Sequence, residues 1–285
     1  MKKVFKWVII ALLLIACGAL GTVYVLNNDI IVLNSKGMIG LKERELLITA
    51  SLLMLIVVIP VYILTIAFAW KYREGNEKAK HAPDWEHNYI AEYCWWGIPC
   101  IIIIILAVVT YKTTHELNPF RPIPSEKPGK AIQAVALNWK WLFIYPEEGI
   151  AAVNYVEFPE KRPIDFEITA DAPMNSFWIP QLGGQIYAMP AMRTQLHLIA
   201  NEVGTFSGRS SNISGKGFAG MLFTAKATTE EGFKSWVASV KKTAKTLTME
   251  GYEQLVQPSE YNPVEFYVLE DKNLFDRIIQ KYKPE

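Results

Sequence analysis

Cysteine and histidine are scarce in this chain, which holds three Cys and four His among 285 residues. Cys17, Cys94 and Cys100 all lie in the first hundred positions, and His197 is the only histidine after residue 115. Thiolates and imidazoles are the side chains that bind copper and zinc in most protein sites. A copper or zinc site of the usual ligands is therefore excluded from the second half of the chain.

The chain also carries little net charge, +1 at pH 7 with His neutral, and no block of basic residues. A protein that binds nucleic acid usually concentrates Lys and Arg on one face or in one stretch. No nucleic-acid partner is therefore expected. The mean hydropathy of +0.14 is slightly positive, which is unusual for a soluble protein and predicts long apolar runs.

Three long apolar stretches contain no charged residue, namely residues 7–26, 46–70 and 93–111. About 20 apolar residues in a helix are enough to cross a bilayer. A buried core helix is the alternative, but runs of this length are long for a globular core. The second and third runs predict a hairpin of two transmembrane helices over residues 46–112.

The amino terminus has the order of a secretory signal, with three lysines in the first six residues followed by an apolar segment. Residues 14–17, Leu-Ile-Ala-Cys, resemble the bacterial lipobox, in which the cysteine thiol carries a lipid. We therefore predict a lipoprotein signal peptide over residues 1–16 and a lipid anchor on Cys17. The alternative is an uncleaved membrane helix, because the apolar segment continues to Leu26.

The positive charges indicate the orientation in the membrane. The short loop between the two predicted spans holds Lys71, Arg73, Lys78 and Lys80. Short cytoplasmic loops carry an excess of such residues, so residues 17–45 are expected to form a periplasmic segment. The chain is then a multi-pass protein of the bacterial inner membrane, in contact with membrane lipids, with its C-terminal domain in the periplasm.

The part after the membrane hairpin begins with a proline-rich linker, residues 113–129. Short apolar runs between turns follow, and residues 164–169 alternate strictly between apolar and polar. Many short strands with frequent turns predict an all-β sandwich or barrel over residues 130–227. From Thr228, a Thr-x-x-Glu capping box and helical spacing predict a C-terminal helical extension over residues 228–285.

Residues 215–220 read Gly-Lys-Gly-Phe-Ala-Gly, which has the letters of a dinucleotide-binding loop. Such a loop must follow a parallel strand and open a helix. The residues after Gly220 read as a strand instead, so this match does not indicate a nucleotide site.

Three segments together resemble subunit II of the haem–copper oxidases. Residues 35–73 and 91–115 resemble its two membrane helices, and residues 138–154 resemble its aromatic-rich strand. The resemblance implies a cupredoxin-like sandwich for residues 130–227.

In the cytochrome c-oxidizing branch of that family, the domain binds a two-copper centre through a His and a Cys-x-Glu-x-Cys-Gly-x-x-His-x-x-Met loop. The corresponding positions here are Asn175, Ser210, Asn212, Ser214, Phe218 and Met221. Only Met221 keeps its ligand type, since hydroxyls, amides and a phenyl ring cannot replace thiolates and imidazoles. The loss resembles the quinol-oxidizing branch, typified by the bo-type ubiquinol oxidase.

The resemblance therefore implies a structural and assembly subunit of a proton-pumping quinol oxidase, which converts ubiquinol and O2 to ubiquinone and water. This chain would hold no cofactor and no catalytic residue, because neither main span contains the histidines that haem iron and copper need. Haems, copper and the ubiquinol site are expected in a partner, subunit I, with subunits III and IV beside it. Cytochrome c is not expected as a partner.

Glu92 precedes the second span at its cytoplasmic edge. The resemblance implies a place at the mouth of a proton-uptake channel of subunit I, and the alternative is a helix-start carboxylate favoured by the helix dipole. Trp139 and Trp141 are interpreted as packing aromatics. His197 is predicted to be exposed, because it lies on the polar phase of its strand.

Two other functions are considered. A membrane-tethered cupredoxin-like lipoprotein could chaperone copper or another ligand, with methionine thioethers as its ligands (Met174, Met189, Met192 and Met221). Methionines scattered over strands are more often core residues. A true cytochrome c oxidase subunit is the third reading, and the missing thiols argue against it.

Overall fold

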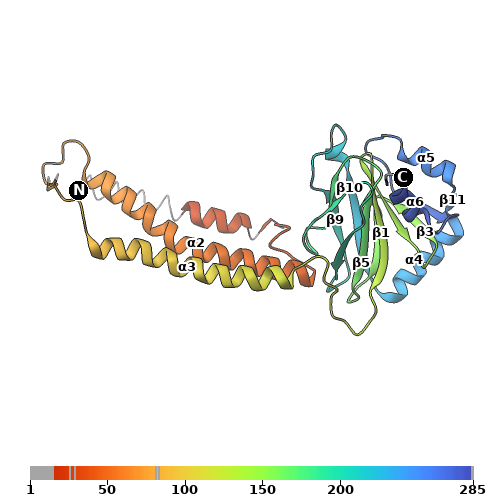
Figure 1. Ribbon diagram of the computed structural model, residues 1–285, viewed down its shortest axis with the longest axis horizontal. Helices are drawn as coiled ribbons and strands as arrows, with labels where there is room; N and C mark the ends of the chain where they lie inside the picture. Colours follow the sequence, from red (N-terminus) through yellow and green to blue (C-terminus); the bar gives the residue numbers. More distant parts are fainter. Residues whose placement is uncertain (1–15, 26, 29, 81, 83, 284–285) are drawn as a thin grey trace. The chain divides into compact units, whose positions relative to one another are not determined.

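The computed structural model describes residues 16–283 except 26, 29, 81 and 83 (Figure 1). The chain forms two compact units, of which one is residues 42–121. The other combines residues 122–285 with the N-terminal residues through 41. The predicted signal peptide, residues 1–16, lies outside the described residues except for its last residue, which belongs to a short apolar helix over Ala16–Val25.

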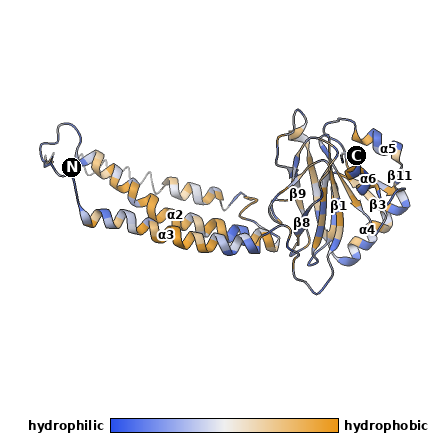
Figure 2. Ribbon diagram, viewed as in Figure 1, coloured by the Kyte–Doolittle hydropathy of each residue, from blue (hydrophilic) through white to orange (hydrophobic). Residues whose placement is uncertain are grey.

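Two long helices, α2 (Met38–Lys71) and α3 (Tyr89–Glu116), account for the predicted membrane hairpin. Both are long and apolar enough to cross a membrane, and Figure 2 shows apolar residues along much of their length. At about 1.5 Å per residue, the 34 residues of α2 extend roughly 50 Å, beyond the ~30 Å hydrocarbon layer. The helices therefore continue past the predicted bounds of 46 and 112 into polar sequence.

Polar side chains define the ends of this hairpin. The Asn88 side chain caps α3 by accepting a hydrogen bond from the backbone N–H of Ala91 at 3.1 Å. Lys42 near the start of α2 donates to Glu116 at the end of α3 over 2.9 Å. Hence the two helices run antiparallel, with the start of α2 in contact with the end of α3.

The C-terminal domain, called the exterior domain below, is a sandwich of two sheets, as predicted. The larger sheet has the strand order β11-β12-β3-β2-β1-β5-β8 and the smaller one β4-β10-β9-β6-β7. The strands of the larger sheet are β1 (Lys130–Leu137), β2 (Lys140–Tyr145), β3 (Ile150–Val153), β5 (Ile164–Ala170), β8 (Thr194–Leu198), β11 (Lys245–Leu247) and β12 (Glu265–Leu269). Those of the smaller sheet are β4 (Tyr155–Pro159), β6 (Asn175–Trp178), β7 (Ile186–Ala188), β9 (Gly204–Ser210) and β10 (Leu222–Thr228).

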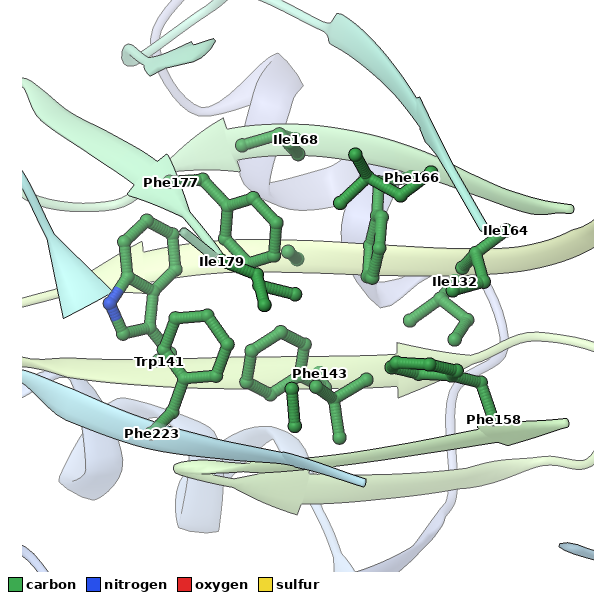
Figure 3. Packing of buried hydrophobic residues seen from close by; sticks show 14 of the residues in the cluster. Ile132, Trp141, Phe143, Phe158, Ile164, Phe166, Ile168, Phe177, Ile179 and Phe223 are labelled. Carbon is green, nitrogen blue, oxygen red and sulfur yellow. The ribbon is translucent and has the colours of Figure 1, made fainter. Parts of the chain in front are cut away.

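Aromatic and branched side chains from both sheets fill the space between them (Figure 3). Ile164, Phe166 and Ile168, the apolar positions of the alternating segment, are all buried. Phe177 lies between the two sheets, with its ring centroid 5.3 Å from that of Trp141 and 5.2 Å from that of Phe223. Ring pairs of this kind contribute about 0.5–1.5 kcal/mol each beyond their burial. Trp141 is therefore a core residue, as interpreted from the sequence.

The C-terminal extension contains the expected helices, α4 (Glu230–Thr243), α5 (Met249–Val256) and α6 (Leu274–Gln280). The cap of α4 is Thr229, whose hydroxyl accepts from Gly232 N–H at 3.1 Å, and not Thr228 as predicted. The extension also supplies β11 and β12, which continue the larger sheet beyond β3. A second apolar cluster, which includes Leu142, Tyr252 and Phe275, fixes α5 and α6 against that sheet.

The chain just before and at the start of α2 is part of the exterior unit. Gly37 forms an isolated antiparallel bridge with Ala200, and the N–H of Lys36 donates to the carbonyl of Gln181 at 2.7 Å. A Cβ on Gly37 would lie only 2.5 Å from the Leu182 carbonyl oxygen. A glycine is therefore required where this segment approaches the domain.

Candidate functional site

The segment over residues 208–221, called the loop below, comprises the end of β9 and the connection to β10, and it closes with a short 3-10 turn, η1 (Phe218–Gly220). Strand β6 lies beside β9, with Phe177 opposite Ser210. Asn175 begins β6 and is therefore held next to the start of the loop. The pairing of β6 with β9 brings together residues that are far apart in sequence.

Polar side chains satisfy one another at the base of this loop. The Ser210 hydroxyl donates to Asn175 Oδ1 at 2.9 Å, and both residues are buried. The Asn175 amide nitrogen donates to the Pro173 carbonyl at 2.8 Å. Asn212 Nδ2 donates to the Met174 carbonyl at 2.9 Å. The bonds from Ser210 and Asn212 connect the loop to the first residue of β6 and to the residue before it.

The other three predicted positions have different surroundings. The carbonyl of Ser214 accepts from the Trp139 indole N–H at 3.1 Å, whereas its hydroxyl is buried with no hydrogen-bond partner among the described residues. Phe218 is half-buried in the turn. Met221 is fully buried in the sandwich core. Its thioether is thus a packing group.

The glycines of the Gly-x-Gly-x-x-Gly sequence have a packing role. A Cβ on Gly217 would lie 2.5 Å from the Trp139 indole, and one on Gly220 would lie 2.8 Å from the Tyr261 ring. Gly215 has φ +107°, which side chains rarely adopt. The residues that follow form the strand β10, as predicted. The glycines therefore allow two aromatic rings to lie directly on the backbone of the loop.

The donor set of the loop does not fit copper. A two-copper centre needs soft thiolates and imidazoles, but Asn175 and Ser210 offer an amide and a hydroxyl that already bind each other. Within the described part of the chain, no group of three or more His, Cys, Asp or Glu is placed to hold a metal ion. The residue types and the hydrogen bonds both disagree with a copper site here.

A segment of the C-terminal extension, residues 257–262, covers the same end of the sandwich. Buried Lys140 donates to the Gln257 carbonyl at 2.9 Å and to the Ser259 hydroxyl at 2.5 Å. Burial lowers the pKa of Lys140, and the charge of Glu265 opposes this shift. Lys216 in the loop pairs with Glu260 at 3.2 Å. The extension therefore holds the loop from outside, a contact that the sequence analysis missed.

A second missed cluster surrounds Asp171, which follows β5 and is buried. Its carboxylate accepts from Tyr252 at 2.7 Å, from Lys281 at 2.8 Å and from Tyr282. Burial would raise the pKa of Asp171, but the bonds from Lys281, Tyr282 and Tyr252 outweigh it and lower that pKa. Burial and the neighbouring carboxylate raise the pKa of Tyr252. No local pattern indicates this cluster, because an Asp at the end of a strand is usually exposed and its partners lie 81 to 111 positions further along the chain.

The remaining predicted residues belong to other elements of the chain. Glu92 is half-buried in the first turn of α3, with Oε1 3.4 Å from His87 Nδ1 and 3.4 Å from the Asn88 N–H. Cys17 is exposed on the short helix Ala16–Val25. The prediction for His197 is wrong, because its side chain is only 10% exposed and contacts Asp165 at 2.6 Å across the β5–β8 pair.

The methionines considered as thioether ligands differ in exposure. Met174 and Met192 are exposed, whereas Met221 is buried. The prediction of core positions is right for Met221 and wrong for the two exposed residues, because strand ends and turns carry side chains out of the core. Of the two tryptophans considered, Trp139 contacts the loop through its indole ring, and Trp141 belongs to the buried core.

Comparison with known proteins gives relatives for most of the chain. The family model described as cytochrome c oxidase subunit II, periplasmic domain, matches residues 149–228, and the COX aromatic rich motif matches residues 241–284. The cytochrome bo(3) ubiquinol oxidase subunit 2 of Pseudomonas aeruginosa is 53% identical over 255 residues, which cover 90% of this chain and 77% of the relative. The protein of that name from Pseudomonas putida is 52% identical and covers 88% of this chain and 80% of its own length. The ubiquinol oxidase subunit 2 of Acetobacter aceti is 47% identical, with 88% and 82% covered.

Proposed function

The chain belongs to the ubiquinol oxidase subunit 2 family, and on that premise we propose that it is a copper-free, non-catalytic subunit whose partner, subunit I, holds the redox centres. Membership confirms the resemblance that the sequence suggested and makes the protein a subunit of a terminal quinol oxidase. The copper or ligand chaperone is not supported, because the relatives are named as oxidase subunits.

The bond between Ser210 and Asn175 is the observation that carries the proposal. Two positions that would supply a thiolate and an imidazole to copper instead satisfy each other at 2.9 Å. Without a metal relay, electrons from a water-soluble cytochrome have no redox group to enter in this domain. A quinol dissolves in the bilayer and can deliver its electrons directly to subunit I. This domain then serves to hold the assembly together.

The test is oxygen uptake by the complex purified through this subunit, supplied with either ubiquinol or reduced cytochrome c. Uptake with ubiquinol alone is expected. Uptake with cytochrome c would mean that electrons cross the sandwich, and the proposal would be wrong. Subunits I, III and IV are expected to co-purify, and haem and copper analysis of the separated subunits would locate the redox centres.

The two candidate spans and the periplasmic family domain fit the bacterial inner membrane, with the C-terminal domain in the periplasm. In this orientation the loop between α2 and α3 lies in the cytoplasm, because short loops with several basic residues are usually cytoplasmic and this loop has four. Cys17, exposed on its helix, is available for a lipid anchor.

Glu92 is proposed as a proton collector for subunit I. Its carboxylate sits in the first turn of α3, at the cytoplasmic side in this orientation, and remains 34% exposed. His87 beside it is 69% exposed, so this pair is open to solvent. A carboxylate at this depth can accept protons from solvent and pass them onward.

A further inference from the structure

The cytoplasmic end of α2 carries a pocket that the oxidase function does not use. It has a volume of about 800 Å³ and lies entirely within the membrane unit. Three cations and three aromatic rings line it: Lys71, Arg73, Lys80, Phe68, Tyr72 and Trp85. The acidic residues of the same loop, Glu74, Glu77, Asp84 and Glu86, are not among the lining residues.

Among the described residues, no carboxylate lies within 4 Å of Lys71, Arg73 or Lys80, although other lysines and arginines of the chain form such pairs. The Lys71 ammonium is 5.3 Å from the centroid of the Tyr72 ring, and the Arg73 guanidinium is 4.4 Å from that of Trp70. These contacts hold the cations over rings without neutralising them. Three positively charged side chains therefore line one pocket, and no carboxylate of the described residues forms an ion pair with them.

The end of a helix normally presents carbonyl oxygens that repel an anion, but three of the last four in α2, those of Phe68, Trp70 and Lys71, accept hydrogen bonds. Arg73 Nη1 donates to the Trp70 carbonyl at 2.9 Å, and the N–H of Tyr72 donates to the Phe68 carbonyl at 2.9 Å. The Asn76 amide donates to the Lys71 carbonyl. The capped helix end therefore leaves the positive charge of the pocket dominant.

We propose that this pocket binds the phosphate of an anionic phospholipid such as phosphatidylglycerol. Lys71, Arg73 and Lys80 would hold the phosphate, and Phe68 and Trp85 would lie against the start of the acyl chains. Aromatic rings favour that depth of the bilayer, and basic pockets at the cytoplasmic side bind anionic headgroups. Free inorganic phosphate shares the headgroup chemistry but would gain nothing from the aromatic side of the pocket. The assignment of the pocket to the cytoplasmic side rests on the proposed orientation.

The test uses the purified, delipidated oxidase complex, titrated with phosphatidylglycerol or phosphatidylcholine, with bound lipid counted by native mass spectrometry. The variant K71Q/R73Q/K80Q is expected to hold one phosphatidylglycerol fewer than the wild type, with affinity at this site weakened about a hundredfold, since each cation contributes roughly fivefold. The matched control K234Q/K241Q/K242Q removes the same charge from exposed positions of α4 and is expected to keep the wild-type number. Co-purification of the other subunits verifies that each variant assembles.

A second variant, K71R/K80R, keeps the charge and should retain the lipid. Three outcomes would overturn the proposal: equal phosphatidylglycerol binding by wild type and K71Q/R73Q/K80Q, equal binding of phosphatidylcholine at the site, or displacement of the lipid by millimolar inorganic phosphate. The last outcome would assign the pocket to free phosphate. Because lipid is counted and turnover is not measured, failure here is separate from failure of the proposed oxidase role.

Discussion

Asp171→Asn removes one charge from the cluster that joins α5 and α6 to the sandwich, with almost no change in volume. The buried carboxylate accepts hydrogen bonds from three residues, Tyr252, Lys281 and Tyr282. Hydrogen bonds to a charged group contribute about 1.5–3 kcal/mol each, and breaking a buried pair costs about 3–5 kcal/mol. Lys281 is half-exposed and can turn to water, which lowers the cost. We expect α6 to lose about 3 kcal/mol of protection against local opening.

Hydrogen exchange of the α6 peptide in the intact complex measures this loss directly. Since about 1.4 kcal/mol is a tenfold change, amides of residues 274–280 should exchange roughly a hundredfold faster in Asp171→Asn than in the wild type. Asp276→Asn is the matched control, because Asp276 lies on the same helix and pairs with Arg193 while exposed. Exposed pairs contribute at most about 1 kcal/mol. Equal exchange rates in Asp171→Asn and wild type, or an equal effect of the control, would refute the reasoning.

The same cluster gives a pH dependence with a definite sign. The pKa of Asp171 is lowered in the folded protein from its ordinary value of 3.8. A carboxyl group with a lowered pKa stabilises the fold above its unfolded pKa and loses that contribution as pH falls through the folded pKa. Protection of α6 should therefore be constant near neutral pH and decline only in acid, and Asp171→Asn should lack that decline.

Three further predictions concern the loop, the membrane edge and the amino terminus. Gly217→Ala places a methyl group 2.5 Å from the Trp139 ring and should destabilise the loop by about 1–3 kcal/mol, which faster amide hydrogen exchange in residues 208–221 would show. Gly97→Ala is the control, because a Cβ there has nothing within 4 Å. Unchanged exchange of the loop in Gly217→Ala would contradict the packing role. Glu92→Gln should slow quinol turnover at unchanged subunit composition, and unchanged turnover would remove Glu92 from the proton path. The intact mass of the mature subunit should correspond to a chain that begins at a lipid-modified Cys17, and Cys17→Ser should abolish this product. A full-length, unmodified wild-type subunit would disprove the lipid anchor.

The loop over residues 208–221 shows how a metal-binding scaffold can keep its shape with other contacts. In a metal-binding relative, coordinate bonds to the metal would connect β6 to both ends of the loop. Here the Asn175–Ser210 bond, the Trp139 ring on Gly217 and the Lys216–Glu260 pair make those connections. The C-terminal extension contributes the last of these.

The sequence by itself determined the class of the protein and the chemistry of its loop. Apolar runs predict α2 and α3 because about 20 uncharged residues are needed to cross a bilayer, and strict alternation identifies the buried face of residues 164–168 because side chains alternate along a strand. The residue types at Asn175 and Ser210 were enough to argue against copper, because ligand chemistry belongs to the side chain.

Tertiary structure alone decided which distant residues meet. Asp171 and Lys281 are 110 positions apart, and their contact follows from the packing of α6 against the sheet. The same holds for His197, which pairs with Asp165 because β8 lies beside β5, and for β11 and β12, whose place in the larger sheet no local pattern predicts. Periodicity and capping act over a few residues, whereas the pairing of strands and the burial of charges depend on the whole chain.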